Sequence, residues 1–548
     1  MRRVQAGLHP AGPVCGALMA LLLLSACGGE EGPWVGRVEP PQRPVLRVAA
    51  DSDPAGLDPT RYASQSSWRV ARMLFEGLTA LDTEGRVRPA AAHRWGHEGE
   101  ARRWTFDLRP DLRWSDGKPL TAHDFVFSWR RVVDPATASE TAGTLYVVRG
   151  ARAVNEGRAS PLELGVRALS DTTLAVELEG PDPGFPLRAA LPPFFPLPAH
   201  LVGESGDQEW PGQQPPVCNG PFLLETWHTG ERLTVVPNPS YWNRSAVQLE
   251  QVVVYPLESE ESAWNLYRAG DVDWTTANRI GADLARSLIE REYTEVRTTP
   301  VLQVYYLELN TRRPPLDDPR VRRALEMATP REEITRRLFG AGQTVTRRFV
   351  STDLPGWEPP PAPAGGPDRA RELLADAGYP GGEGLPPMTF LYNDRAIHAA
   401  VAQYLQGVWL RELGAEVELV QMDFNSMDAR ARRGDFHILR SGWLADLPFP
   451  DEYLKVFVEG NPNNATGWSD AAYDQLVSDA ARLADETRKY RLLRRAESIL
   501  LEAAVIIPIL QNNAVQLVKP YVEGLRPNVL DVVDWTGVRV RTDWRVPR

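Results

Sequence analysis

The chain has 548 residues, which exceeds one ordinary domain and indicates about two to four domains. It is 43% hydrophobic and 24% charged, as soluble globular proteins are, so it can form large cores. Its formal net charge of -11 argues against nucleic-acid binding and against a broad basic surface that could hold anionic lipid.

The N-terminus is typical of an exported protein that stays attached to a membrane. Met1 to Arg3 is basic, and Ala17 to Leu24 is an apolar run too short for a permanent transmembrane helix. The run ends in Leu-Ser-Ala-Cys, which resembles the bacterial lipobox, whose cysteine is diacylated after cleavage. We expect a signal peptide over residues 1–26, a lipid on Cys27 and a disordered tether over 27–44. A plain secretory signal with an incidental cysteine is the alternative.

Beyond the tether, apolar periodicity and turn residues predict strands and helices. Strands are predicted over 46–50, 104–109, 174–178, 223–225, 233–236, 249–255, 304–309, 390–393, 417–420, 436–439 and 505–510, and helices over 263–270, 368–377, 398–412 and in two segments between 473 and 501. Thr121 is expected to cap a further helix. Strand and helix alternate in the second half of the chain, which is typical of an α/β fold with ligand loops at strand ends. No later segment is apolar enough to span a membrane, so a lipid would be the only anchor.

One stretch, residues 439–446, combines groups suited to holding the charged end of an extended peptide. Ser441 and Gly442 predict the end of the strand at 436–439. Gly442 would let another backbone approach closely, and Trp443 offers a flat apolar face with one N–H donor. Asp446 can accept hydrogen bonds from an ammonium group, and Arg440 can orient a carboxylate. The alternative is a strand end with a solvated Arg/Asp pair and a core tryptophan.

Signatures of catalysis, metal binding and cofactor binding are missing from the sequence. There is no GxSxG, HExxH or phosphate loop, so an enzyme is not expected. Asp51 and Asp53 have the spacing that opens a calcium loop, but position twelve is Tyr62 rather than Glu. Among the three cysteines only Cys218 lies in the body of the chain, so no disulfide framework, metal site or cofactor is predicted there.

Several short motifs, each modest alone, occur in an order that is highly specific. They are Leu57-Asp58-Pro59, Phe75-Glu76-Gly77-Leu78, Leu108-Arg109 with Trp114-Ser115-Asp116-Gly117, Asn219-Gly220-Pro221-Phe222, Asn238-Pro239 with Tyr241-Trp242, Pro319-Arg320-Val321-Arg322, and Arg440 with Gly442-Trp443 and Asp446. From about Leu46 to the tail, the chain resembles the extracellular solute-binding proteins of peptide ABC transporters, closest to the periplasmic oligopeptide-binding proteins.

The resemblance implies an α/β, periplasmic-binding-protein-like two-lobe fold with an extra inserted domain, giving three domains and a hinge between the lobes. The expected division is domain I at 45–83, 207–301 and 514–548, the inserted domain II at 84–206, and domain III, the second lobe, at 302–513.

The resemblance also implies the function of a lipid-anchored, extracytoplasmic monomer on the periplasmic side or the cell surface. It would capture a short peptide between its lobes, pair the extended backbone like an added strand, and deliver it to an ABC transporter permease. Relatives with the same fold bind dipeptides, nickel chelates, haem or oligosaccharides, so other cargo is the first alternative. Neither a cofactor nor nucleic acid is expected.

Transferred residue by residue, the resemblance assigns roles to three groups of positions. Asp446 would pair with the peptide α-ammonium, while Gly442, Trp443 and Leu444 would supply backbone groups and an aromatic wall. Arg440 and His398 would lie near the peptide carboxylate, although His398 could instead be a surface helix histidine. The facing backbone of domain I would come from Ala63, Ser64 and Gln65.

Four positions depart from the family pattern and leave the ligand's length and preference open. The Tyr that often follows the site Asp is Leu447 here, and a Tyr that covers the start of the peptide falls on Thr141. A Lys that can meet the carboxylate of longer peptides falls on Phe339, with Arg336 and Arg337 nearby in sequence. The disulfide of the best-known relative falls on Gln303 and Leu444 and is therefore absent.

Overall fold

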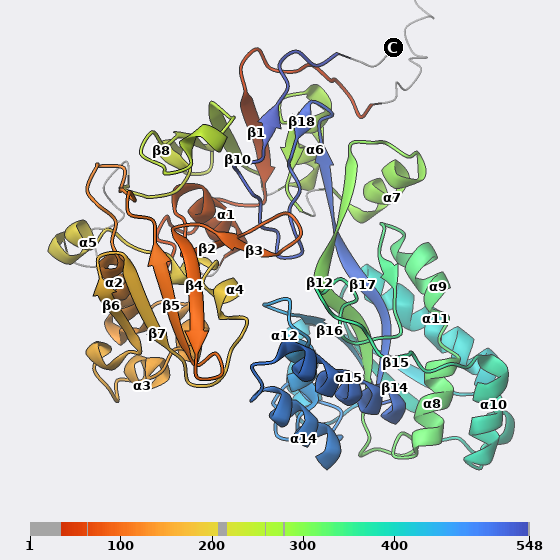
Figure 1. Ribbon diagram of the computed structural model, residues 1–548. Coiled ribbons are helices and arrows are strands. Elements are labelled where there is room, and N and C mark those ends of the chain that lie inside the picture. The colour runs from red at the N-terminus through yellow and green to blue at the C-terminus, as the bar shows by residue number, and fades with distance from the viewer. Residues whose placement is uncertain (1–33, 63, 206–215, 258, 278–279, 546–548) are drawn as a thin grey trace, which may run out of the picture.

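The computed structural model describes residues 34–62, 64–205, 216–257, 259–277 and 280–545. The expected signal peptide, the expected lipidation site Cys27 and residues 27–33 of the expected tether lie outside these residues, whereas residues 34–44 of the tether are described, with Val35 buried against the first lobe. Within them, the chain forms two lobes joined by two long antiparallel strands, β12 (Val296–Leu309) and β17 (Ile506–Val518) (Figure 1). The two-lobe α/β fold expected from the motifs is therefore confirmed.

The first lobe contains both ends of the described chain. Its strands are β1 (Val45–Ala50), β2 (Thr79–Leu81), β3 (Val87–Pro89), β4 (Ala92–Glu98), β5 (Arg103–Leu108), β6 (Val166–Ser170), β7 (Thr173–Glu177), β8 (Phe222–His228), β9 (Arg232–Pro237), β10 (Gln251–Pro256), β11 (Trp274–Thr275), β18 (Val522–Glu523) and β19 (Arg539–Val540). Its helices are α1 (Gln65–Leu74), α2 (Ala122–Val133), α3 (Ala151–Asn155), α4 (Phe185–Arg188), α5 (Ala199–Ser205), α6 (Glu260–Ala269) and α7 (Ala282–Glu290).

The second lobe lies between the two long strands in sequence. Its strands are β13 (Thr344–Val345), β14 (Met388–Asn393), β15 (Val417–Met422) and β16 (Ile438–Leu444). Its helices are α8 (Pro319–Met327), α9 (Arg331–Glu333), α10 (Pro367–Asp376), α11 (Ala396–Leu413), α12 (Phe424–Arg432), α13 (Pro450–Leu454), α14 (Ala471–Ala480) and α15 (Glu486–Ala503).

One sheet runs through both lobes. Its strand order is β15-β14-β16-β12-β17-β11-β1-β10-β9-β8, with β13 added on β17, while β4-β5-β7-β6 form a separate four-stranded sheet. The pairing of β12 with β17 shifts register between Pro300 and Val304, which is where the chain passes from one lobe to the other. A pocket of about 470 Å³, open to solvent, lies beside this passage and is lined by residues that include Thr83, Arg297 and Val529.

Several local predictions are confirmed and one is wrong. Thr121 precedes α2 and the Asp124 carboxylate accepts its backbone N–H at 2.8 Å, while Gly270 ends α6 with a φ of 80°. The predicted end of the strand at Ser441 and Gly442 is wrong, because β16 continues to Leu444. Ser441 and Gly442 pair with Tyr306 and Tyr305 of β12, and these cross-strand partners outweigh the weak local preference for a strand.

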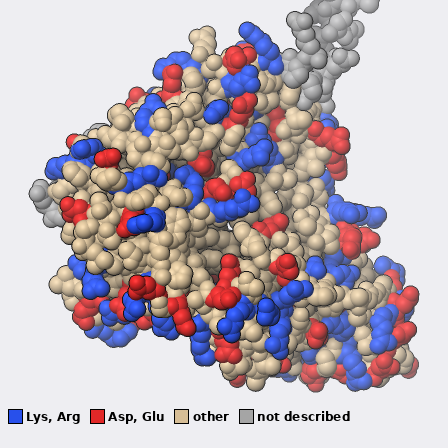
Figure 2. Space-filling view, viewed as in Figure 1, with Lys and Arg blue, Asp and Glu red and all other residues tan. Residues whose placement is uncertain are grey.

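Each lobe has its own hydrophobic core. A large cluster of buried side chains fills the first lobe and contains Leu46, Trp129, Trp274 and Tyr521 among others. Two further clusters fill the second lobe, one around α11 and one around α13, α14 and α15. In the part of the chain that the structure describes, no helix is both long and apolar enough to cross a bilayer. On the face shown in Figure 2, cationic and anionic side chains are interspersed.

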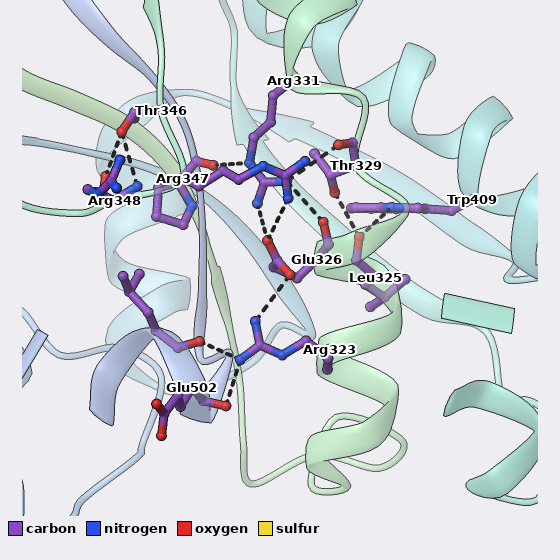
Figure 3. A network of polar contacts seen from close by, with 12 residues as sticks. Arg323, Leu325, Glu326, Thr329, Arg331, Thr346, Arg347, Arg348, Trp409 and Glu502 are labelled. Carbon is purple, nitrogen blue, oxygen red and sulfur yellow. Dashed lines mark hydrogen bonds and ion pairs between the residues drawn. The ribbon is translucent and has the colours of Figure 1, made fainter. Parts of the chain in front are cut away.

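A buried charge network fixes the C-terminal end of α8 against β17 (Figure 3). The Glu326 carboxylate contacts Arg331 at 2.7 Å, Arg323 at 3.1 Å and Arg347 at 3.6 Å. The Arg331 side chain is fully buried and also donates to the Pro508 carbonyl at 2.7 Å. Burial lowers the pKa of Arg331 to about 10, so Glu326 supplies the carboxylate that keeps this guanidinium charged.

A second buried acid, Glu497 on α15, has no cation bonded to it within the described part of the chain. Its Oε1 accepts the backbone N–H groups of Phe349 and Val350 at 3.0 and 2.9 Å, while Oε2 has no hydrogen-bond partner among the described residues. Burial raises the pKa of Glu497 to about 7 despite these two donors.

Replacing Glu326 should destabilise the second lobe. Glu326→Gln keeps the side-chain shape but leaves the buried Arg331 without its anion, so the free energy of unfolding should fall by about 3 kcal/mol. Urea unfolding of the purified protein measures this loss. The matched control is Glu332→Gln, an exposed acid one residue after Arg331, which should change stability little. Equal stability of the two variants would contradict the role of the network.

Glu497 should make stability depend on pH. Its folded-state pKa of about 7 exceeds the value of about 4.3 expected in the unfolded chain, so the folded state holds the proton more tightly. This contribution is complete below about pH 4 and is lost as pH rises to 7, a decrease on the order of 3 kcal/mol. Urea titrations at pH 5 and pH 8 should show a smaller decrease for Glu497→Gln than for wild type. The exposed control Glu459→Gln should retain the wild-type difference, and a Glu497→Gln difference equal to wild type would refute the assignment.

Candidate functional site

Strand β16 carries the central group of predicted site residues. Its ladder with β12 pairs Arg440 with Leu307, Gly442 with Tyr305 and Leu444 with Gln303. Because side chains alternate along a strand, Arg440, Gly442 and Leu444 share one face of the sheet. An ideal Cβ on Gly442 would lie 3.6 Å from Nη2 of Arg440, so the guanidinium lies back over the glycine.

Arg440 and His398, both expected near the peptide carboxylate, belong to one cluster. The Arg440 guanidinium lies 4.8 Å from the centre of the Tyr305 ring, and the Tyr305 hydroxyl lies 3.4 Å from Nδ1 of His398. Phe339 packs edge-on against Tyr305 at 5.4 Å, and Asn393 places Oδ1 3.5 Å from Nη1 of Arg440. The cluster therefore presents a guanidinium on an aromatic floor.

The electrostatics of this cluster centre on the Arg440 guanidinium, because His398 beside it is neutral. His398 is 4% exposed, so the alternative interpretation of a surface histidine is wrong. Burial, and then the nearby guanidinium groups of Arg440 and Arg395, lower the pKa of His398 to about 3, so its imidazole is neutral near pH 7. Among the described residues Arg440 has no carboxylate partner, and its buried Nε has no hydrogen-bond acceptor. The guanidinium is therefore available to an external anion.

Asp446 lies in the loop between β16 and α13 and is exposed. No described residue forms an ion pair or a hydrogen bond with its carboxylate, so the expected alternative of a solvated pair with Arg440 is wrong. The residues on either side of Asp446 are buried, since Ala445 is 4% exposed and Leu447 is 3% exposed. A free carboxylate is thus held on a short, well-anchored segment.

Trp443 and the first-lobe positions have partners of their own. The Trp443 indole N–H donates to the Glu452 carbonyl at 3.0 Å, so it is not a free donor for a ligand. Ser64 caps α1 by accepting the backbone N–H of Ser67 at 3.2 Å, and Gln65 donates to Asp531 at 3.0 Å. Both Ser64 and Gln65 are exposed, whereas Ala63 lies outside the described residues.

The departures from the family pattern have physical consequences in the structure. Leu444 and Gln303 face each other in register on adjacent strands, so the absent disulfide would have joined neighbouring positions. Leu444 is instead 58% exposed, and Gln303 accepts the side-chain N–H of Asn512 at 2.8 Å. Thr141 is buried and donates to the Thr60 carbonyl at 3.0 Å, so it offers the surface no long side chain.

Two residues of the Arg440 cluster were missed by sequence reasoning. Tyr305 lies within a predicted strand, but its contact with Arg440 depends on the β12–β16 register. Asn393 ends a predicted strand, and the parallel pairing of β14 with β16 brings that end toward Arg440. Sequence alternation could have indicated which face each residue occupies, but not which strands are neighbours.

Comparison with known proteins places this geometry in a family. Residues 86–465 match the bacterial extracellular solute-binding proteins, family 5. The chain is 36% identical over 495 residues, 88% of this chain and 90% of the other, to a protein of Escherichia coli strain K12 named probable deoxycholate-binding periplasmic protein YgiS. It is 32% identical to the periplasmic oligopeptide-binding protein OppA of Salmonella typhimurium, covering 93% of this chain and 94% of OppA.

The fold also matches a solved structure of the same kind. The periplasmic murein tripeptide binding protein MppA, in its unliganded open form, superposes with a TM-score of 0.85 at 31% identity, covering 92% of this chain and 98% of MppA. The two lobes joined by β12 and β17 thus superpose on those of a binding protein in its open form. The chain belongs to family 5 of the bacterial extracellular solute-binding proteins.

Proposed function

We propose that this protein binds short peptides between its lobes and delivers them to the permease of an ABC transporter. The observation that carries the proposal is a complementary pair of free charges on one loop and strand. Among the described residues, Asp446 is a carboxylate without a cation and Arg440 is a guanidinium without a carboxylate. A peptide with free ends supplies one ammonium and one carboxylate, so it can satisfy both.

Enclosure between the lobes explains why both charges need partners from the ligand. In the open conformation Asp446 is hydrated, but closure of the lobes would remove water from it. A charge buried without a counter-charge costs several kcal/mol, which opposes closure around an empty site. An ammonium group beside Asp446 removes that cost, so the ligand itself would favour the closed conformation.

The spacing of the two charges limits the ligand's length. The Arg440 guanidinium lies over Gly442, four residues before Asp446. Four residues of extended chain span at most roughly 13 Å, which matches an extended peptide of about two to four residues. Exposed Leu444, between the two charged groups, offers an apolar contact on the same face as Arg440. The names of OppA and MppA, an oligopeptide-binding and a murein tripeptide binding protein, support this class of ligand.

The 36% identity to a probable deoxycholate-binding protein favours a second candidate ligand class. Deoxycholate has a carboxylate and a large apolar body but no amine. It could use Arg440 and the aromatic floor of Tyr305 and Phe339, and it would leave Asp446 without a partner. Calorimetric competition between trialanine and deoxycholate on Arg440→Ala and Asp446→Ala variants separates the two, because only peptide binding should require both residues.

Attachment to the membrane is a further part of the proposal. The Leu-Ser-Ala-Cys sequence supports lipidation at Cys27, which would leave the tether to hold the lobes beside the permease. Beside the permease the protein would act as a monomer, and none of the helices in its described residues could cross a bilayer.

Removing the carboxylate at Asp446 should weaken peptide binding strongly. Asp446→Ala should cost about 2–5 kcal/mol of binding free energy for trialanine, measured by isothermal titration calorimetry against peptides of two to five alanines. N-acetylated trialanine should bind wild type and Asp446→Ala equally weakly, because its ammonium is already absent. Glu459→Ala, an exposed acid elsewhere on the second lobe, is the matched control. Unchanged affinity of Asp446→Ala would remove this residue from the site.

Replacing the candidate lipidation site should release the protein from the membrane. After expression of the full chain in a bacterial host, wild type should sediment with membranes and Cys27→Ser should remain in the soluble extracytoplasmic fraction. Intact-mass spectrometry of wild type should show a diacylated N-terminal cysteine. A soluble, unmodified wild-type protein would show that the leader is a plain secretory signal.

A further inference from the structure

The loop that carries Asp446 leaves the second lobe and returns to it. Before the loop, the Ala445 N–H donates to the Leu302 carbonyl at 2.9 Å, and Ala445 belongs to the core around α13–α15. After the loop, Tyr453 and Leu454 of α13 belong to the same core. Between these anchors, however, Leu447 is a buried member of the large first-lobe cluster. The Leu447 side chain therefore packs in the core of the first lobe, although the chain on both sides of the loop belongs to the second lobe.

Phe449 makes a second contact between the lobes. An ideal Cβ on Gly184, in the first lobe, would lie 2.4 Å from Cζ of Phe449, so the ring rests directly on the glycine backbone. The Arg188 guanidinium, also from the first lobe, lies 5.7 Å from the centre of the ring. The Lys489 ammonium of α15, from the second lobe, lies 5.9 Å from the same centre. The aromatic ring is thus held by cations from both lobes.

Polar contacts close the base of the loop and tie it to the first lobe. The Trp443 indole bridges the end of β16 to the Glu452 carbonyl at 3.0 Å. The Glu452 carboxylate lies 4.0 Å from Arg188, whose Nε donates to Asp182 at 2.7 Å. Asp446, exposed at the start of this loop, lies one residue from an anchor in each lobe.

We infer that Leu447 and Phe449 are positioning residues that hold Asp446 at the junction of the lobes. The inference rests on the proposed function of Asp446 in binding the peptide ammonium. The chain crosses between the lobes in β12, in β17 and in this loop, so a closing rotation has its axis near these crossings and moves Asp446 least. Arg440, four residues before Leu444 on β16, lies roughly 13 Å farther from the crossing and moves more.

The two ends of the ligand should therefore be recognised at different stages. The Asp446 side of the site is already in place in the open conformation, whereas Arg440 and His398 meet the ligand as the lobes close. Asp446 governs capture of the ammonium end, and Arg440 governs retention of the closed complex. Loss of the Phe449 contact should impair ammonium recognition and leave carboxylate recognition intact.

The test compares trialanine with its N-acetylated and C-amidated forms on Phe449→Ala, with dissociation constants from calorimetry and rates from stopped-flow tryptophan fluorescence. The ratio of dissociation constants for acetylated over free trialanine should fall about tenfold relative to wild type. The ratio for the amidated form should stay unchanged, and the association rate of free trialanine should fall.

A second variant acts on the same contact from the other lobe. Gly184→Ala places a methyl group where Phe449 lies and should lower the acetylation ratio in the same way, so the test does not depend on Phe449→Ala folding well. If both variants keep the wild-type acetylation ratio while Asp446→Ala abolishes it, the positioning role is wrong and the proposed function survives. If wild type itself does not distinguish acetylated from free trialanine, the proposed function is wrong.

Discussion

A carboxylate cannot be enclosed between two protein lobes unless a positive charge is enclosed with it. The protein follows this rule at several of its buried charges, whereas Glu497, buried with no ion-pair partner among the described residues, instead has its pKa raised to about 7 by burial. Lys519 and Glu295, both fully buried, lie 3.3 Å apart, and Arg131 pairs with Asp58 at 2.8 Å. Asp446 differs because none of the described residues around it supplies a cation. The missing partner is the physical basis for assigning a ligand to the space between the lobes.

The same constraint connects binding to movement. Arg440 lies on an aromatic floor with a neutral histidine beside it and no carboxylate, so the second lobe presents an unbalanced cation. On the proposed function, a ligand with both charges would neutralise Asp446 and Arg440 together, and only then would closure carry no electrostatic cost. The loop with Leu447 and Phe449 holds Asp446 near the inferred axis of closure. Arg440 lies farther from that axis, on the lobe that moves.

Much of the fold and the family could be predicted from the sequence, since both depend on local periodicity and on ordered motifs. The continuation of β16 through Ser441 and Gly442 could not, because its cause lies in the partner strand β12. The burial of His398 was equally hidden, because it depends on Tyr305 from a distant strand. Leu447 could be recognised as a departure from the family pattern, but its insertion into the first-lobe core is a contact that no local pattern encodes. The domain boundaries and the ligand-binding residues stay predictions.

A crystal structure of the closed protein with trialanine tests the central claim most directly. The account predicts that the peptide α-ammonium nitrogen lies within about 3 Å of an Asp446 carboxylate oxygen, shielded from solvent by both lobes. An Asp446 side chain left in bulk water, or a bound cargo with no amine at that position, would contradict it.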